Sequence, residues 1–388
     1  MGVSLRPDAD HRIRAGHLWV FSNELQDGFQ ERTPGELIEL LDASGKFVGI
    51  GTVNSHSLIA VRLLTRSRKQ IDTEFFRSRI RAAIQLRERV YGPSDTAYRL
   101  IYSESDGLPG LIVDRFGDVL VVQSLTAGME KLLDIILQVM SEELHPRGIV
   151  LANDSPVREF EGLPLKREIA SGNFDLPLRF EQDGITFLSD PISGQKTGFY
   201  FDQHLNRRLV QQYLAAGVTV LDLFSYTGAF GLYALKAGAS HVTFVDDSEK
   251  ALGLARQSVS ENGWEKRAQF IKQDIFPWLS SVTETYDVVI VDPPALAKSR
   301  SKVSSALRAY RDLNARAMAR VKPGGLLATS SCSGLVASIA WREALRDAAR
   351  KAGKRMRIIA QGSQAPDHPI LAAMPETEYL KFAIAVVD

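Results

Sequence analysis

A chain of 388 residues has room for two or three domains that each bury a core. Its composition, 45% hydrophobic and 24% charged, is ordinary for a globular protein, and no apolar run reaches the ~20 residues that span a bilayer. Cys332 is the single cysteine, which excludes an intrachain disulfide and a four-cysteine zinc site, and a reducing cytoplasm fits best.

The N-terminal part predicts a small β-rich domain over residues 1–69. Its first residues lack the apolar core of a secretory signal. Apolar residues alternate with turn residues in three stretches that we expect to be strands, at 35–42, 47–53 and 58–64. Residues 73–91 then show apolar side chains at helical spacing, so a helix follows this domain.

Residues 70–180 read as a second, α+β unit. The stretch 111–125 predicts two strands joined by a hairpin turn at Phe-Gly-Asp. We expect a helix near 128–142 and a further strand at 147–154.

From about residue 218 strands and helices alternate, which indicates a doubly wound, mostly parallel sheet. The expected strands are 218–224, 241–246, 268–274, 286–294, 324–333, 355–362 and 379–387.

Polar residues at the ends of these strands predict a ligand site, because such sheets bind ligands at the carboxyl ends of their strands. The stretch from Asp222 to Gly231 lacks the G-x-G-x-x-G pattern of dinucleotide binders. Gly228 allows close approach to the backbone, and Asp222 suits a cation. Asp246 can accept bonds from both hydroxyls of a ribose, and Asp274 from an adenine amino group. Each acid taken alone could instead be a helix cap or turn residue.

These features together match S-adenosylmethionine, a nucleoside with a positively charged amino-acid tail and no phosphates. NAD is the alternative cofactor, since the acid after the second strand also suits it. The missing glycine fingerprint argues against NAD.

Two further motifs suggest methylation of a nucleobase. Asp292-Pro293-Pro294 follows the fourth strand, and its prolines stiffen a loop that can lie against a planar substrate. Cys332 follows the fifth strand. A thiolate that adds to C6 of a pyrimidine makes C5 nucleophilic enough to accept a methyl group. The alternative for Cys332 is a buried small hydrophobic residue.

Two basic runs stand out despite a net charge of only +1. Residues 62–89 hold nine Arg or Lys against three acids, and residues 298–322 hold eight against one. Such clusters can build a positive face that binds nucleic acid. Each run could instead be a solvated helix face.

The motifs together resemble the RlmI-type family of ribosomal large-subunit RNA cytosine-C5 methyltransferases, over nearly the whole chain. Residues 17–25 and the strands after them resemble its RNA-binding PUA domain, and residues 99–118 resemble its central α/β domain. The segment 194–208 and the motifs DLFSYTGAFG, VDPPALAKS, SSCSG and QAPDHP match in order.

The resemblance implies an α/β protein of three domains: a PUA-like β-barrel (1–69), a central α+β domain (70–180) and a class I S-adenosylmethionine-dependent methyltransferase domain with a seven-stranded sheet (181–388). It implies ribosomal RNA as the partner, with no membrane or metal, and leaves a homodimer possible. The implied catalytic residues are Cys332 and Asp292. The implied cofactor residues are Asp222, Phe224, Thr227, Gly228, Asp246, Asp274, Asp292, Lys196, Thr197 and Phe199. The implied substrate residues are Pro293, Pro294, Lys298 and His368.

One departure concerns the wider group of RNA cytosine methyltransferases, many of which carry a second cysteine after the Pro-Pro pair. Ala295 occupies that place here, as in the RlmI type, so the base that removes the C5 proton is unassigned. His368 is a candidate for that base. A loop histidine held by its neighbours is the alternative.

Two other functions remain open at this point. A related class methylates guanine N7 with a similar Asp-Pro-Pro motif but without the cysteine, so Cys332 is the discriminating residue. A non-catalytic RNA-binding protein with a methyltransferase fold is the other, and the intact acids and cysteine argue against it.

Overall fold

The computed structural model describes residues 2–93 and 95–388 and divides into two compact units. Unit 1 holds the chain up to Leu178 together with Asp190–Phe201 and Pro366–Thr377. Unit 2 holds Arg179–Ser189, Asp202–Ala365 and Glu378–Asp388. The boundaries at 69 and 180 inferred from the sequence remain a prediction.

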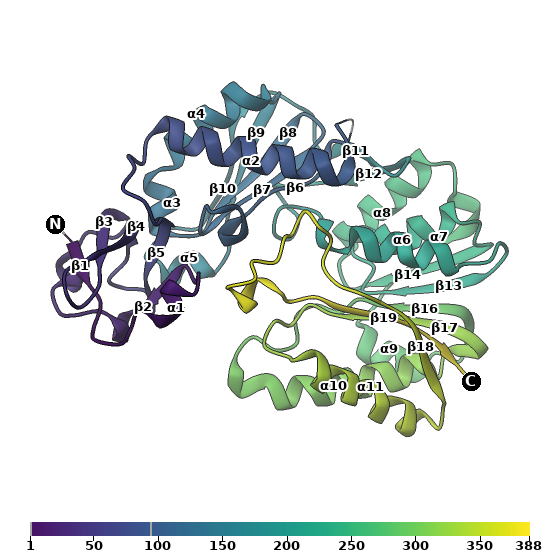
Figure 1. Ribbon diagram of the computed structural model, residues 1–388. Helices are drawn as coiled ribbons and strands as arrows, with labels where there is room; N and C mark the ends of the chain where they lie inside the picture. Colours follow the sequence, from purple (N-terminus) through teal and green to yellow (C-terminus); the bar gives the residue numbers. More distant parts are fainter. Residues whose placement is uncertain (1, 94) are drawn as a thin grey trace. The chain divides into compact units, whose positions relative to one another are not determined.

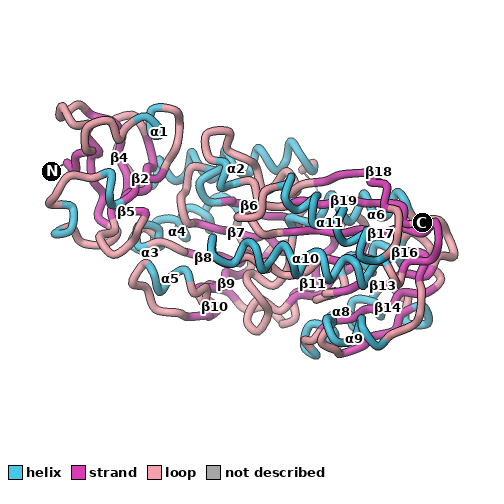
Figure 2. Tube along the Cα trace, turned by 90° about the horizontal axis from the view of Figure 1, so that it is seen from below, coloured by secondary structure: helices cyan, strands magenta, loops and turns pink. Residues whose placement is uncertain are grey.

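Unit 1 begins with a five-stranded sheet, which confirms the expected β-rich N-terminus. Its strand order is β1-β3-β4-β5-β2, and in Figure 2 these strands gather with the short helix α1. The elements are β1 (Gly2–Ser4), α1 (His11–Arg14), β2 (Trp19–Phe21), β3 (Glu36–Leu41), β4 (Phe47–Val53) and β5 (Ile59–Thr65).

The rest of unit 1 is a second five-stranded sheet, in the order β10-β9-β8-β7-β6, with helices packed on it. The strands are β6 (Ala97–Tyr102), β7 (Leu111–Phe116), β8 (Val119–Ser124), β9 (Gly148–Asn153) and β10 (Lys166–Gly172). The helices are α2 (Thr73–Tyr91), α3 (Ala127–Lys131), α4 (Leu133–Leu144) and α5 (Val157–Phe160). The hairpin and the helix at 73–91 are confirmed, whereas the helix expected near 128–142 is two helices that meet at Leu132.

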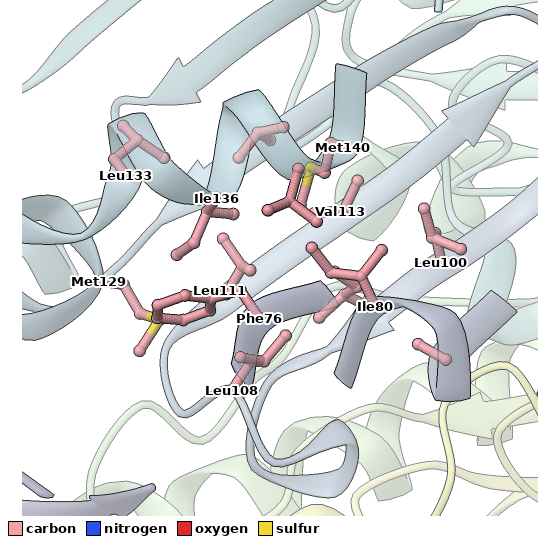
Figure 3. Close-up of a cluster of buried hydrophobic side chains, with 14 of the residues drawn as sticks. Phe76, Ile80, Leu100, Leu108, Leu111, Val113, Met129, Leu133, Ile136 and Met140 are labelled. Carbon is pink, nitrogen blue, oxygen red and sulfur yellow. The ribbon is translucent and has the colours of Figure 1, made fainter. Parts of the chain in front are cut away.

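An apolar core joins α2 and α4 to this second sheet. Figure 3 shows Phe76 and Ile80 of α2 lying near Ile136 and Met140 of α4, with Val113 of β7. All five side chains are buried, and each such burial contributes roughly 1.5–3 kcal/mol. The helix itself begins where the Asp72 carboxylate accepts the Phe75 N–H at 3.0 Å.

Unit 2 is built on the seven-stranded sheet that the sequence predicts, in the order β15-β14-β13-β16-β17-β19-β18. β13 to β17 are parallel, and β19 is antiparallel to both of its neighbours. The strands are β13 (Thr219–Leu223), β14 (His241–Asp246), β15 (Ala268–Lys272), β16 (Tyr286–Val291), β17 (Val321–Ser331), β18 (Met356–Gly362) and β19 (Lys381–Val387).

Helices cover both faces of this sheet, which confirms the doubly wound fold. The helices α9, α10 and α11 share one core with β13, β16 and β17, while α7 and α8 pack against β13, β14 and β15 (Figure 1). A two-stranded sheet of β11 and β12 precedes the seven-stranded sheet in the chain. The remaining elements are β11 (Leu178–Gln182), β12 (Ile185–Ser189), α6 (His204–Tyr213), α7 (Ala229–Lys236), α8 (Glu249–Glu261), α9 (Ile275–Ser281), α10 (Val303–Met318) and α11 (Ser338–Ala352). Among the helices of the described chain, none is long and apolar enough to cross a membrane.

Candidate active site

The carboxyl ends of the parallel strands bring the predicted acids of unit 2 to one edge of the sheet. Asp222 lies inside β13 rather than after it, in register with Ile290 of β16. Asp246 ends β14, and Asp292 directly follows β16. Asp274 follows β15 at a distance of two residues and is exposed. The strand order therefore places Asp222 between Asp246 and Asp292.

Asp222 is almost fully buried, and its Oδ2 accepts the N–H of Gly231 in α7 at 2.9 Å. Removal from water raises its pKa to about 8; the Gly231 N–H opposes this shift, and the charges of Asp292 and Asp246 add to it. The group is therefore largely protonated at neutral pH and would ionise next to a cation.

Asp246 accepts one backbone N–H on each carboxylate oxygen, from Tyr226 at 2.8 Å and from Ser248 at 2.9 Å. Each oxygen keeps a second acceptor position, so a pair of ribose hydroxyls could still bind. Burial raises the pKa of Asp246, and the two N–H groups act against that rise.

The loop between β13 and α7 has an unusual backbone. Phe224 and Tyr226 both have positive φ, at 60° and 49°, and Gly228 follows at 80°. Such conformations cost free energy for residues with a side chain and tend to occur at functional sites. The Ser225 hydroxyl in this loop is buried, with no hydrogen-bond partner in the described part of the chain.

These observations fit S-adenosylmethionine. Among the described residues, none of the three carboxyl groups of Asp222, Asp246 and Asp292 forms an ion pair with Lys or Arg. A ligand with positive charge would lower the free-energy cost of ionising them. Thr227 is buried in the same loop, and Phe224 packs edge-on against Phe276. Asp274 caps the N-terminus of α9, because its Oδ1 accepts the Phe276 N–H at 3.0 Å. Its proposed contact with adenine remains a prediction.

The fourth-strand motif meets the fifth strand through Asp292. Its Oδ1 accepts hydrogen bonds from the Ser330 hydroxyl and from Gln203 Nε2, the latter at 2.8 Å. Removal from water raises the pKa of Asp292 to about 6, while the bonds from Ser330 and Gln203 lower it. Oδ2 has no hydrogen bond to any described residue and is left to bind a ligand or substrate.

Cys332 directly follows β17 and is partly exposed. Its Sγ lies 3.7 Å from the carbonyl oxygen of Pro293, within reach of a weak S–H···O bond. Ser333 fixes the same turn, because its Oγ accepts the Ala297 N–H at 3.2 Å and lies 2.9 Å from the Tyr310 hydroxyl. The structure thus brings Cys332 and the Pro293-Pro294 loop together.

Sequence reasoning did not single out three polar residues at this edge. Gln203 and Ser330 hold Asp292, and Lys381 of β19 donates to the backbone beside Cys332. Gln203 lies in the stretch 194–208 that carried the resemblance, so that segment held a signal. Ser330 and Lys381 lie in strands. There the sequence pattern shows only which residues are apolar and which are polar, and not which residue of another strand each one meets.

Four predicted site residues belong to unit 1 and are described within it. Lys196 is exposed, with its ammonium 4.7 Å from the centre of the Tyr200 ring. The Thr197 hydroxyl donates to Asp114, and Phe199 is buried beside Phe201.

His368 is the fourth of these residues and is almost fully buried. Its Nδ1 lies 2.8 Å from Oδ1 of Asp367, whose Oδ2 accepts the Arg99 N–H at 2.9 Å. The Asp367 carboxylate therefore fixes the imidazole ring. Burial acts to raise the pKa of Asp367, but His368 and these hydrogen bonds outweigh it and lower that pKa. The roles of all four residues remain predictions.

More than half of the cations in the basic run at 62–89 have acidic partners, which favours the alternative to a positive face. Five of its nine cations are ion-paired, and Arg87 is completely buried against Asp106 at 2.6 Å. The other four pairs are Arg62–Glu161, Arg68–Glu39, Arg77–Glu143 and Arg81–Glu143. This run is mainly a set of structural ion pairs.

The run at 298–322 divides into two parts. Its second half is paired or bonded, for example Lys322 with Asp287 at 2.9 Å and Arg320 with a backbone carbonyl. Its first half has no ion pair to any described residue and is exposed. We call this first half the basic loop cluster: Lys298, Arg300, Lys302 and Arg308. It begins four residues after Pro294.

Residues 3–66 match the PUA-like domain family, and residues 168–374, more than half of the chain, match the S-adenosylmethionine-dependent methyltransferase family. Two curated relatives are named ribosomal RNA large subunit methyltransferase I. The one from Alteromonas mediterranea is 39% identical, over 99% of this chain and 98% of its own. The one from Photobacterium profundum is 40% identical, over 95% of each chain.

Solved structures support the fold. A structure from Streptococcus mutans described as a sam-dependent methyltransferase matches all of both chains, with a TM-score of 0.84 and 19% identity. Another methyltransferase structure, complexed with SAH, matches with a TM-score of 0.85 and 19% identity over 100% of this chain and 99% of its own.

Proposed function

The chain belongs to the family of the ribosomal RNA large subunit methyltransferases I, and we propose that it methylates C5 of a cytosine in 23S ribosomal RNA, with S-adenosylmethionine as methyl donor. The observation that carries the choice of base is Cys332, held at the end of β17 against the Pro293 carbonyl. Guanine N7 is the second candidate, because the related class shares the Asp-Pro-Pro motif. It ranks below cytosine because methylation of guanine N7 needs no nucleophilic cysteine at this place.

S-adenosylmethionine supplies an electrophilic methyl group on a positively charged sulfur, and its amino-acid end carries an ammonium. We assign Asp222 to that ammonium, because its carboxyl group is buried without an ion-pair partner in the described chain. Asp246 takes the ribose hydroxyls through the free positions on its two oxygens. Gly228 and the left-handed loop before α7 let the ligand lie close to the backbone.

Cys332 acts as the nucleophile. Its thiolate forms a bond to C6 of the cytosine, and the electron pair of the C5–C6 double bond becomes available at C5. C5 would then take the methyl group from the cofactor, as the bond between that group and the cofactor's sulfur breaks and its electron pair stays on the sulfur. A base removes the proton from C5, the C5–C6 double bond re-forms, and the sulfur leaves C6 as a thiolate. The enzyme returns to its starting state, and one proton is released for each methyl group transferred.

Asp292 recognises the cytosine edge. Its Oδ2 is available to accept from the exocyclic amino group, a donor that uracil lacks at that position. Pro293 and Pro294 have no N–H and present a stiff surface to the ring. Because the thiol must reach the face of the base and Asp292 its edge, we propose that the target is unpaired or flipped out of its stack.

The basic loop cluster binds the RNA backbone next to the target. Its four side chains are exposed, and their positive charge is not compensated by acids of the described chain. Such charges attract phosphates and release counterions on binding. The PUA-like domain is the second RNA-binding element. We place the protein in the cytoplasm, where Cys332 stays reduced, and we propose no homodimer.

A covalent trap tests this function. RNA carrying 5-fluorocytidine at the target should remain bound to the wild-type protein in the presence of S-adenosylmethionine, since fluorine at C5 cannot leave as a proton. Cys332→Ser should abolish both trapping and methylation but keep its affinity for S-adenosylmethionine, which calorimetry measures. Full turnover by Cys332→Ala would refute the covalent mechanism and favour guanine. Absence of methyl transfer and of cofactor binding in the wild type would indicate a non-catalytic RNA-binding protein.

A further inference from the structure

Lys381 is a partly buried cation that the proposed mechanism does not use. It is the first residue of β19 and lies opposite Ser331 in the antiparallel pair with β17. Its Nζ donates to the carbonyl oxygens of Ser333 at 2.7 Å and Tyr379 at 2.9 Å. The ammonium is thus fixed at the backbone of the turn that carries Cys332.

Its partners leave the charge of Lys381 uncompensated. An ammonium has three protons, and only two of them have acceptors among the described residues, both of them neutral carbonyls. Burial lowers the pKa of Lys381 to about 8, and Cys332 and Glu378 are the two groups whose negative charge opposes that shift. Glu378 is exposed whereas Cys332 is only partly exposed, so the thiol is the less solvated of these two groups.

Other ionisable groups also act at the thiol. Tyr310 of α10 faces it with a hydroxyl whose pKa is raised by burial, so this group stays neutral at pH 7. Asp292, next to Pro293, is the one acidic side chain that we place beside the loop, and its charge opposes a thiolate. A nearby cation favours the ionised form of Cys332.

We propose that Lys381 is the positioning residue that holds Cys332 as a thiolate, through the charge of its ammonium and its bond to the Ser333 carbonyl. This inference rests on the proposed function, in which Cys332 is the nucleophile. A nearby cation lowers the pKa of a thiol, whose ordinary value is about 8.5, and the attacking species is the thiolate. The thiolate in turn keeps Lys381 protonated.

The single cysteine makes a direct test possible. Iodoacetamide reacts with a thiolate by displacement of iodide, so its rate against pH reports the ionisation of Cys332 alone. The rate is measured from pH 5.5 to 9.5, by mass spectrometry of the full-length protein without RNA or cofactor. The variants are Lys381→Gln, which keeps a hydrogen-bond donor but loses the charge, Lys381→Arg, which keeps the charge, and Lys266→Met, an exposed control.

We expect Lys381→Gln to react about tenfold more slowly at pH 7, as its midpoint moves up by about one pH unit. At pH 9.5 its rate should reach that of the wild type, since the thiol is then ionised in both. Lys381→Arg should keep most of the wild-type rate, and Lys266→Met all of it. Equal midpoints in the wild type and Lys381→Gln would overturn the proposal, as would equal slowing at every pH.

A second measurement covers the case in which Lys381→Gln does not fold. Lys381→Arg then carries the test through the pH profile of methylation, where the midpoint of kcat should stay near that of the wild type and KM for S-adenosylmethionine should not change. A Lys381→Arg profile with the midpoint of an ordinary thiol would overturn the proposal. If Cys332→Ala methylates RNA fully, the proposed function fails, whereas the alkylation profiles still decide whether Lys381 controls the thiol.

Discussion

Asp222→Asn is the substitution that examines the cofactor site most closely. The Asp222 carboxyl is 1% exposed, and burial raises its pKa to about 8. Its one hydrogen-bond partner in the described chain is the N–H of Gly231. If the ligand ammonium binds next to it, the carboxyl should lose its proton when the ligand arrives.

The size of this effect follows from the pKa. At pH 7 a group with a pKa of about 8 is roughly 90% protonated, so binding should release about 0.9 proton. The affinity should then rise nearly tenfold for each pH unit between about 6 and 7.5, equivalent to ~1.4 kcal/mol. Asp292, with a pKa of about 6, is largely ionised at pH 7 and adds little to this release.

Calorimetric titration with S-adenosylmethionine in phosphate and in Tris measures the protons released, because the two buffers differ in ionisation enthalpy. The difference between wild type and Asp222→Asn cancels the titration of the ligand's own amino group. We expect the wild type to release about 0.9 proton more than the variant at pH 7. Equal release by the two proteins would refute the assignment of Asp222 to the ammonium.

The same group should affect the stability of the unliganded protein. Its pKa in the folded state is raised above the unfolded value of about 3.9, so its contribution is full below that value and is lost as pH rises through 8. From pH 5 to 7 the wild type should lose ~1.4 kcal/mol of unfolding free energy per pH unit relative to Asp222→Asn. A constant difference in urea unfolding across this range would contradict the protonated state.

Four further outcomes are expected. Asp246→Ala should weaken S-adenosylmethionine binding by roughly 1.5–3 kcal/mol and leave RNA affinity unchanged, and an unaltered cofactor Kd would exclude it from the ribose site. Neutralising the basic loop cluster to Gln should reduce the slope of log Kd against log salt for RNA by about 0.7–0.9 for each phosphate that the protein no longer neutralises, whereas Arg77→Gln, which removes a paired cation, should not change it. His368→Ala should allow methyl transfer but slow product release if His368 is the base, and a normal release rate would leave the base elsewhere. Gly228→Ala should lower Tm and cofactor affinity together, since its φ of 80° is left-handed and a Cβ there would lie 3.0 Å from Ala255; unchanged values of both would show that the loop tolerates a side chain.

The sequence predicted unit 2 well, because its strands are short, mainly apolar runs separated by helical or polar stretches. All seven strands lie within three residues of the expected ends. The order of the acids along the chain was then enough to place Asp246 and Asp292 at one edge, since parallel strands share a direction.

The structure of the basic run at 62–89 could not be predicted in the same way. Arg77 finds its partner Glu143 66 residues away, and Arg62 finds Glu161 99 residues away. Charge counted along the chain shows no such pairing. The break at Leu132 is similar, because neither Gly nor Pro marks it in the sequence.

Lys381 shows that the pattern of apolar and polar residues does not predict which residues of different strands meet in a site. In the sequence it is one charge at the start of an apolar strand. Only the antiparallel register, which sets it opposite Ser331, brings its ammonium to the turn of Cys332. Ser330 meets Asp292 through the parallel register of β16 and β17, in which Thr329 lies opposite Val291.

The nature of the methylated base tests the central claim most directly. 23S ribosomal RNA from a strain that lacks this gene is incubated with the purified protein and S-adenosylmethionine, and its nucleosides are identified by mass spectrometry. We predict 5-methylcytidine as the new product with the wild type and no product with Cys332→Ala. A methylated guanosine, or 5-methylcytidine formed equally well by Cys332→Ala, would contradict the account.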